Sequence, residues 1–128
     1  MNTTTAAALA TIPAAIGAAF GGGTSAGISR GVEGAPDQHL VLLPGEAVDV
    51  DWDAACAFAA SVGGELPTRA EQALLFANLK HEFEPRYYWS SEQAGPSTAW
   101  GQSFVSGHLG STTRSYEVHA RAVRRLEI

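Results

Sequence analysis

The sequence predicts an α+β domain in which short antiparallel strands surround two consecutive helices. Two helical patterns follow one another in the middle of the 128-residue chain, and strand patterns precede and follow them. The strongest strand signal is the stretch 87–107, which holds two of the three tryptophans and alternates large with small side chains. The chain shows no internal repeat, and its length fits a single domain.

The first 23 residues form an arm that is rich in alanine and ends in three glycines. The arm has no basic n-region, so we expect no signal peptide, and it is too short and too rich in alanine to span a bilayer. Leu9, Ile12, Ile16 and Phe20 recur at helical spacing. Two alternatives stay open, a loose tail or an apolar stripe that packs on a neighbouring subunit. We favour the second, and we expect homo-oligomers assembled through residues 1–23.

The folded domain is expected over residues 24–128, and it begins with two short strands. Residues 26–30 fit the first strand. Residues 39–43 are an apolar run that Pro44-Gly45 ends, which predicts a buried second strand. Residues 32–38 contain Pro36 and predict the loop between the two strands.

Two helices are expected next. Asp51 is a good N-cap for a helix over residues 52–62, which Gly63-Gly64 ends. Thr68 and Glu71 form the T-x-x-E pattern of a capping box, which predicts a second helix from there to about Lys80.

The stretch 87–107 predicts a central antiparallel pair of strands. Trp89 lies on the first strand and Trp100 on the second, and residues 92–98, which contain Gly95-Pro96, predict a wide loop between them. Because indole and phenyl rings bury large areas, Trp89, Trp100 and Phe104 are expected to form the structural core. The Gly-, Ser- and Thr-rich residues 107–117 predict a second long loop or a frayed hairpin, and residues 118–128 a final core strand.

The sequence contains no pattern that indicates catalysis, a metal site or a cofactor, so a non-enzymatic protein is expected. The histidines are scattered, and no serine lies in a nucleophile elbow. Cys56 is the only cysteine and is expected to be a small buried residue. Asp49, Asp51 and Asp53 alternate, but the Gly and Glu of a calcium-binding loop are missing. These aspartates are better explained by the start of a helix, where negative charge is favourable.

The net charge of −5 argues against a nucleic-acid partner, because such partners reward basic patches. The one local basic cluster is Arg121, Arg124 and Arg125, whose guanidinium groups are expected to pair with carboxylates. The expected binding face lies instead on the loops 92–98 and 107–117, whose short polar, aromatic and arginine side chains suit an adaptable surface. Its candidate ligand-binding residues are Gln93, Ser97, Thr98, His108, Thr112, Arg114 and Tyr116.

Five motifs in order resemble a bacterial and phage family with a C-type-lectin-like fold. The family includes the C-terminal domain of Legionella collagen-like adhesins, and the variable domains of diversity-generating retroelement proteins, such as the phage major tropism determinant, are similar. The resemblance covers residues 27–125. Its motifs are Leu66-Pro67-Thr68-Arg69, Tyr88-Trp89-Ser90-Ser91, Ala99-Trp100, Phe104 with Gly107, and Arg121-Ala122-Val123-Arg124.

The resemblance implies two helices that flank a small twisted antiparallel sheet, with the N- and C-terminal strands paired. It also implies that the loops between the central strands form the ligand face. Two departures matter: the two disulfides of animal C-type lectins cannot form, and Glu84-Pro85-Arg86 is not the sugar motif Glu-Pro-Asn. Calcium-dependent sugar binding is therefore not expected.

The function that this resemblance implies is that of a phage virion structural protein in the tail, fibre or capsid decoration. It would be made in the host cytoplasm and would attach to other virion proteins or to a host receptor, either protein or glycan, without nucleic acid and without membrane insertion. The alternative is a bacterial surface adhesin or another ligand-binding domain.

Overall fold

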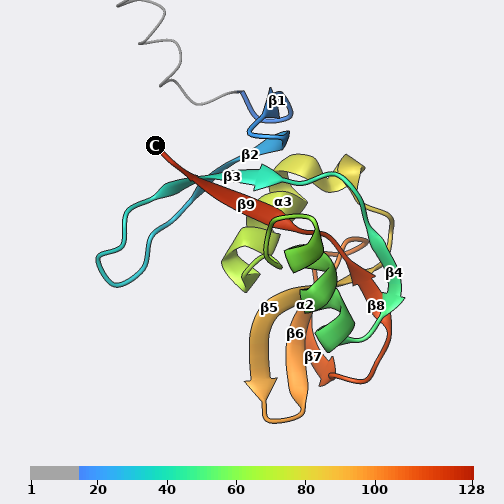
Figure 1. The fold of residues 1–128 in the computed structure, drawn as a ribbon. Coiled ribbons are helices and arrows are strands. Elements are labelled where there is room, and N and C mark those ends of the chain that lie inside the picture. Colours follow the sequence, from blue (N-terminus) through green and yellow to red (C-terminus); the bar gives the residue numbers. More distant parts are fainter. Residues whose placement is uncertain (1–14) are drawn as a thin grey trace, which may run out of the picture.

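The computed structural model describes residues 15–128 (Figure 1). The α+β class predicted from the sequence is confirmed: within these residues the strands form two sheets, and two α-helices pack on them. Within residues 15–128, no helix has the length and apolar character needed to cross a membrane. In chain order the elements are β1 (Ala19–Phe20), β2 (Gly23–Ser29), β3 (Gln38–Leu42), β4 (Ala47–Val50), α2 (Trp52–Ser61), α3 (Arg69–Leu79), the 3-10 helix η1 (Lys80–Glu82), β5 (Tyr87–Gly95), β6 (Thr98–Ser103), β7 (Leu109–Thr113), β8 (Val118–Ala120) and β9 (Val123–Glu127).

The first sheet has the strand order β1-β2-β3-β9 and is antiparallel throughout. The predicted pair of early strands is confirmed, and the connection between them projects from the body of the molecule (Figure 1). Leu40, Val41 and Leu42 are buried, which explains why the apolar run of β3 takes a central place in the sheet. On its other side β3 pairs with β9, so the last strand of the chain lies beside an early one.

The second sheet has the order β4-β8-β5-β6-β7. Its centre is the antiparallel pair of β5 and β6, as the sequence predicts. The expected wide loop over residues 92–98 is wrong, because β5 continues to Gly95 and only Pro96 and Ser97 connect it to β6. The expected loop over residues 107–117 is also wrong in its centre, where β7 pairs with β6. Polar residues form strands here because this edge of the sheet is open to solvent, so the usual apolar alternation is weak.

The predicted single strand over residues 118–128 is two strands in different sheets. β8 joins the second sheet and β9 the first. The alternation of buried and open side chains changes phase between them, because Ala122 and Val123 are both buried. A strand that keeps its course cannot bury two consecutive side chains on one face, so the chain turns from one sheet to the other at this point.

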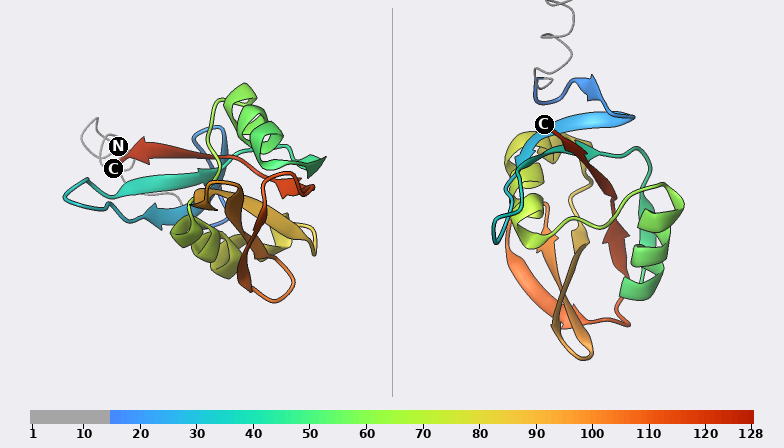
Figure 2. Two further views of the ribbon diagram at one scale, coloured as in Figure 1. Left: turned by 90° about the horizontal axis from the view of Figure 1, so that it is seen from below. Right: turned by 60° about the vertical axis from the view of Figure 1, so that its left-hand side comes forward.

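Both helices begin where the sequence predicts. The carboxylate of Asp51 accepts a hydrogen bond from the Ala54 N–H at 2.8 Å and caps α2. The capping box of α3 is complete: the Glu71 N–H donates to Thr68 Oγ1 at 3.2 Å, and the Thr68 N–H donates to Glu71 Oε1 at 2.9 Å. The two helices lie on opposite sides of the β5–β6 pair (Figure 2).

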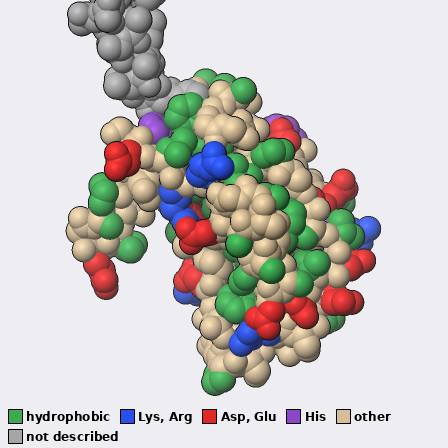
Figure 3. Space-filling view, viewed as in Figure 1, with side chains coloured by type: hydrophobic (Ala, Val, Ile, Leu, Met, Phe, Trp, Pro, Cys, Tyr) green, Lys and Arg blue, Asp and Glu red, His purple; other side chains and the backbone are tan. Residues whose placement is uncertain are grey.

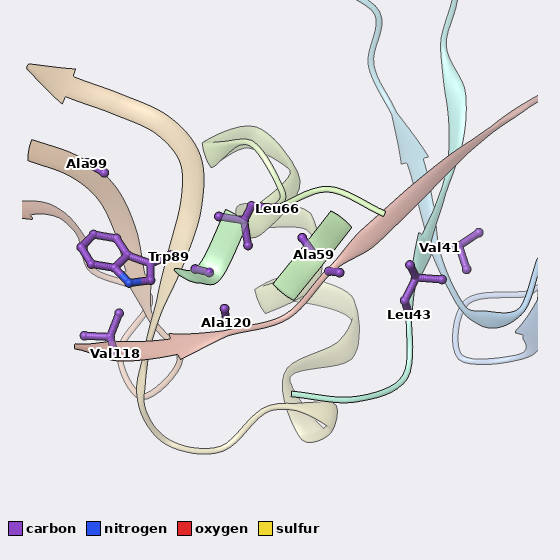
Figure 4. Packing of buried hydrophobic residues seen from close by; sticks show 10 residues of the cluster. Val41, Leu43, Ala59, Leu66, Trp89, Ala99, Val118 and Ala120 are labelled. Carbon is purple, nitrogen blue, oxygen red and sulfur yellow. The ribbon is translucent and has the colours of Figure 1, made fainter. Parts of the chain in front are cut away.

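Two buried clusters fill the space on either side of the second sheet. Trp89 lies in the cluster below α2 and donates from Nε1 to the Val50 carbonyl at 2.9 Å (Figure 4). Tyr88 and Phe104 lie in the cluster below α3. Neighbouring residues of one strand point to opposite faces, so β5 supplies the largest buried side chain of each cluster. Trp89 and Phe104 are thus core residues, as expected.

Trp100, the third expected core residue, is only half-buried and belongs to neither cluster. Ala99 takes the buried position on that part of β6. The guanidinium of Arg69 lies 4.6 Å from the centre of the Trp100 ring, so the indole forms a cation–π contact at the rim. The next residue, Gly101, has no room for a side chain because the Tyr87 ring packs against its backbone. A Cβ added at Gly101 would lie 2.4 Å from Tyr87 Cε1.

Most of the expected assembly arm, residues 1–14, lies outside the described residues. Of its four apolar positions, Ile16 lies in a turn and Phe20 in β1, so these two do not share a helical face. The ring of Phe20 meets His39 edge-on at 5.1 Å between ring centres. The last part of the expected arm therefore takes part in the first sheet.

Candidate functional site

Three of the seven predicted ligand-binding residues lie at one end of the molecule, where β5 turns into β6. Ser97 forms the turn, Thr98 begins β6, and Arg114 follows β7. The Arg114 N–H donates to the Ser97 carbonyl at 2.9 Å, which joins the two segments. We call this the hairpin-end surface. It encloses a shallow depression of about 410 Å³ lined by Asp51, Asp53, Pro96, Ser97, Thr113, Arg114 and Ser115.

The start of α2 supplies the other wall of the hairpin-end surface. The Trp52 N–H donates to the Arg114 carbonyl at 3.0 Å, and the Arg114 guanidinium lies 4.8 Å from the centre of the Trp52 ring. The same guanidinium forms an ion pair with Asp53. Arg114 is thus held between an indole and a carboxylate, which fixes its planar donor group in place.

The two charged side chains of this ion pair, Asp53 and Arg114, are both partly exposed to solvent. The side chain of Asp53 is 74% exposed and that of Arg114 is 31% exposed. Figure 3 shows a basic side chain next to acidic ones near this end of the molecule. An exposed ion pair contributes little to stability, so a ligand can replace Asp53 as the partner of Arg114 at small cost.

The other four predicted ligand-binding residues lie at separate positions and do not form one continuous face with the hairpin-end surface. Gln93 lies nearby on β5 and is exposed, with its amide donating to the Gly95 carbonyl at 3.4 Å. Thr112 lies on β7 opposite Ala99 and is half-buried. His108 lies in the turn before β7, at the far end of that strand from Arg114.

Tyr116 is 58% exposed and lines a different depression. That depression has a volume of about 440 Å³, and its other lining residues are Val48, Asp49, Arg86, Tyr87, Glu117, Val118 and His119. The expected single face is therefore divided between the hairpin-end surface and this neighbouring hollow. Arg114 and Tyr116 both follow β7, but the turn that the Tyr116 N–H closes on the Thr113 carbonyl places Tyr116 beside residues of β4 and β8.

Asp51, Trp52 and Asp53 contribute to the hairpin-end surface from outside the two predicted loops. The sequence did contain a signal, since the alternating acids before and within the start of α2 indicate a helix N-terminus. That signal gives no indication that the helix start meets residues 97 and 114. Only the fold brings these segments together.

Another cavity, with a volume of about 530 Å³, lies between the projecting β2–β3 connection and α3. Its walls are mainly apolar, with Ile28, Val32 and Leu74 among them, and Glu71 and Arg125 lie in its lining. Figure 3 shows acidic and basic side chains side by side at the base of the projection.

The carboxylate of Glu71 is buried, and side chains and backbone of the same chain supply its hydrogen-bond donors. Arg125 donates two hydrogen bonds to it, each of 2.7 Å, and the Ser29 hydroxyl donates a third at 2.6 Å. Burial alone would raise the pKa of Glu71, but the hydrogen bonds from Arg125, Ser29 and Thr68 outweigh burial and lower the pKa. The pair joins α3 to β9 and β2, which is a structural role.

The basic cluster at the end of the chain is only partly as predicted. Arg125 pairs with carboxylates, as expected. Arg121 and Arg124 instead donate to backbone carbonyls, Arg121 to Leu43 and Glu82 and Arg124 to Gly21. Burial lowers the pKa of Arg121. The three arginines thus join segments that are distant in the sequence.

A second cluster of titratable side chains, which the sequence did not indicate, joins Tyr88, Glu46 and His119. The Tyr88 hydroxyl donates to Glu46, and His119 Nδ1 lies 3.1 Å from the other Glu46 oxygen. Burial, followed by the bond to Glu46, raises the pKa of Tyr88, so its hydroxyl stays protonated and acts as a donor. Among residues 15–128, no three His, Cys, Asp or Glu side chains are grouped as a metal site.

The single cysteine, Cys56, is half-buried and free in the structure, on the side of α2. Burial and the nearby Asp53 carboxylate raise the pKa of its thiol. A raised pKa keeps the thiol in its less nucleophilic form, which fits a packing role.

No protein-family model and no curated protein matches this chain.

Proposed function

We propose that this chain is a non-enzymatic attachment module of a phage virion, with the hairpin-end surface as its ligand face. The observation that carries the proposal is the placement of the two ends of the domain. The C-terminus and β1 lie at one end, and the β5–β6 turn lies at the other, in Figure 1 and in the right-hand view of Figure 2. A module held at one end by its arm presents the hairpin-end surface outward, which suits attachment.

We further propose that the domain has a C-type-lectin-like fold. Three features support this: two helices on opposite faces of a small sheet, a central pair that carries the Trp-Ser-Ser and Ala-Trp motifs, and an early strand paired with the last one. The five ordered motifs of the sequence support it independently. In this proposal the β5–β6 turn and the segment after β7 serve as ligand-facing loops.

The alternative proposal is a bacterial surface adhesin or ligand-binding domain, which would use the same surface. Antibody to this chain separates the two. Immunogold labelling of purified phage particles in negative stain supports the virion role. Labelling of intact, uninfected cells with unlabelled particles supports the adhesin role and overturns the first proposal.

The hairpin-end surface is tested by removing its ion pair as a unit. The double variant Asp53→Ala/Arg114→Ala leaves no unpaired charge, and an exposed pair contributes at most about 1 kcal/mol to stability. We expect its melting temperature to stay close to that of the wild type while adsorption of particles to host cells, or assembly with the neighbouring virion protein, falls.

The matched control is Arg30→Ala/Asp37→Ala, which removes another exposed ion pair, of 3.9 Å, on the β2–β3 connection. This control is expected to adsorb and assemble as the wild type does. Adsorption and assembly that are unchanged in the Asp53/Arg114 variant, or equally reduced in both variants, would remove the hairpin-end surface from consideration.

A further inference from the structure

The outer edge of β7 carries a row of backbone groups that lack partners within residues 15–128. β7 is the last strand of its sheet and pairs only with β6. Two hydrogen bonds fix the direction of its backbone groups: the Ser103 N–H donates to the His108 carbonyl, and the Arg114 N–H donates to the Ser97 carbonyl, both at 2.9 Å. Antiparallel strands alternate inward and outward residues, so every second residue from 108 to 114 faces β6.

The residues between these positions therefore direct their backbone groups away from the sheet. These are Leu109, Ser111 and Thr113, and their side chains are exposed as well. One of the outward carbonyls, that of Thr113, accepts from the Tyr116 N–H at 3.0 Å. Three N–H groups and two carbonyls at the edge remain without a protein partner in the described part of the chain.

The other three sheet edges of the described chain are protected against strand addition, whereas β7 is not. β1 has only two residues, β9 carries Arg124, Arg125 and Glu127, and the pairing of β4 shifts register between Ala47 and Val50. Short length, charge and register breaks are the usual devices that keep strand edges from pairing. β7 has five residues, no charge, no proline and an unbroken register with β6.

We propose that the edge of β7 pairs antiparallel with β7 of a second copy of this chain, about a two-fold axis through Ser111. The outward residues are spaced evenly around Ser111, so the axis places Leu109 of one copy opposite Thr113 of the other. The Ser111 and Thr113 N–H groups then meet outward carbonyls that have no partner within residues 15–128, and the Leu109 N–H meets the Thr113 carbonyl, whose second lone pair remains beside the bond from Tyr116. Identical strands can meet here because residues 109–113 bear no charge that would repel its own copy.

The side chains favour the same partner. Leu109 is 41% exposed, and pairing covers it with the methyl group of Thr113 from the second copy. The result is one sheet that continues through both molecules, with two hairpin-end surfaces. This inference does not rest on the attachment function, because it concerns only how two copies of the chain associate.

Introducing opposite charges at Ser111 in two variants of the full chain tests the pairing. In Ser111→Lys the two lysines lie directly opposite each other at the axis, so repulsion opposes association. We expect the particle mass in sedimentation at high concentration to fall to half the wild-type value. Ser111→Glu is expected to do the same. An equimolar mixture of the two variants is expected to regain the wild-type mass, since opposite charges then meet.

The control is Ser106→Lys, which places the same charge in the exposed turn before β7, away from the edge, and keeps the wild-type mass. Thermal melts confirm that all variants are folded. A Ser111→Lys protein with the wild-type mass overturns the proposal. Failure of the Lys and Glu variants to associate on mixing overturns it as well. Adsorption assays on the same proteins report separately on the attachment function.

Discussion

At the scale of single residues, Trp89 and Trp100 provide a direct comparison of two indoles on neighbouring strands. Trp89 is fully buried and hydrogen-bonded, whereas Trp100 is half-buried under Arg69. We expect Trp89→Ala to lower the free energy of unfolding by about 3–5 kcal/mol, as for other buried aromatic residues. Trp100→Ala should cost clearly less, because the removed ring leaves no closed cavity. Urea unfolding measures both, and equal losses would contradict the different burial.

Glu71 gives a pH prediction whose sign follows from its lowered pKa. A carboxyl group whose pKa is lower in the folded state stabilises the protein above its unfolded pKa, about 4.3 for Glu. That stability is lost as the pH falls through the folded pKa. We expect unfolding free energy measured by urea titration to decline below about pH 4, and Glu71→Gln to decline less steeply.

Removing the partner of Glu71 should reverse this behaviour. In Arg125→Leu the Glu71 carboxylate stays buried without its guanidinium, which typically costs about 3–5 kcal/mol at neutral pH. Burial then raises the pKa of Glu71, so protonation becomes favourable and the variant loses less stability than the wild type on acidification. The double variant Glu71→Gln/Arg125→Leu should be more stable than Arg125→Leu at neutral pH. Parallel acid curves for wild type and Arg125→Leu would contradict this account.

At the scale of elements, the capping box of α3 is the clearest case in which local sequence defines a boundary. Thr68→Ala removes the hydroxyl that accepts the Glu71 N–H, and we expect a loss of about 1 kcal/mol in unfolding free energy. Thr68→Ser keeps the hydroxyl and should lose much less. If both variants unfold at the same urea concentration as the wild type, the cap does not stabilise the helix.

The strands show which elements local sequence can predict and which it cannot. β5 and β6 were predicted because their aromatic residues alternate, and the structure confirms them. For β7, Leu109 to Thr113, the sequence predicts a loop, because most of these residues are small and polar and they lack an apolar face. A strand of this kind forms because its backbone completes the ladder of β6, which is a property of the neighbouring strand and not of its own side chains.

For the whole molecule, we propose two separate routes to association, the N-terminal arm and the edge of β7. We expect deletion of residues 2–14 to leave a folded domain, because the described strands and helices all lie beyond that segment. If the arm mediates assembly, the truncated protein has a lower particle mass in light scattering. An unchanged mass for truncated and intact protein would exclude the arm from assembly, whatever the outcome at Ser111.

The hairpin-end surface illustrates how little of a site is visible in one stretch of sequence. Arg114 and Ser97 were predicted, and they do meet. Trp52 and Asp53 complete the surface from a helix far away in the sequence, so no local pattern could include them. Tyr116 and His108 were placed on the same face because residues 107–117 were expected to form one loop, and β7 separates them.

Features that depend on neighbouring residues can be predicted from local sequence: the α+β class, the caps at Asp51 and Thr68, the buried run of β3, and the pairing of β5 with β6. Each is encoded within a few residues, as a side chain that bonds its own backbone or an alternation that selects one face. The tertiary structure alone decided that residues 118–128 divide between two sheets and that Ala99, not Trp100, faces the core. It also decided that β7 exists and that Arg114 meets Asp53. These outcomes depend on packing between segments distant in the chain, where a buried partner or a free strand edge outweighs local preference.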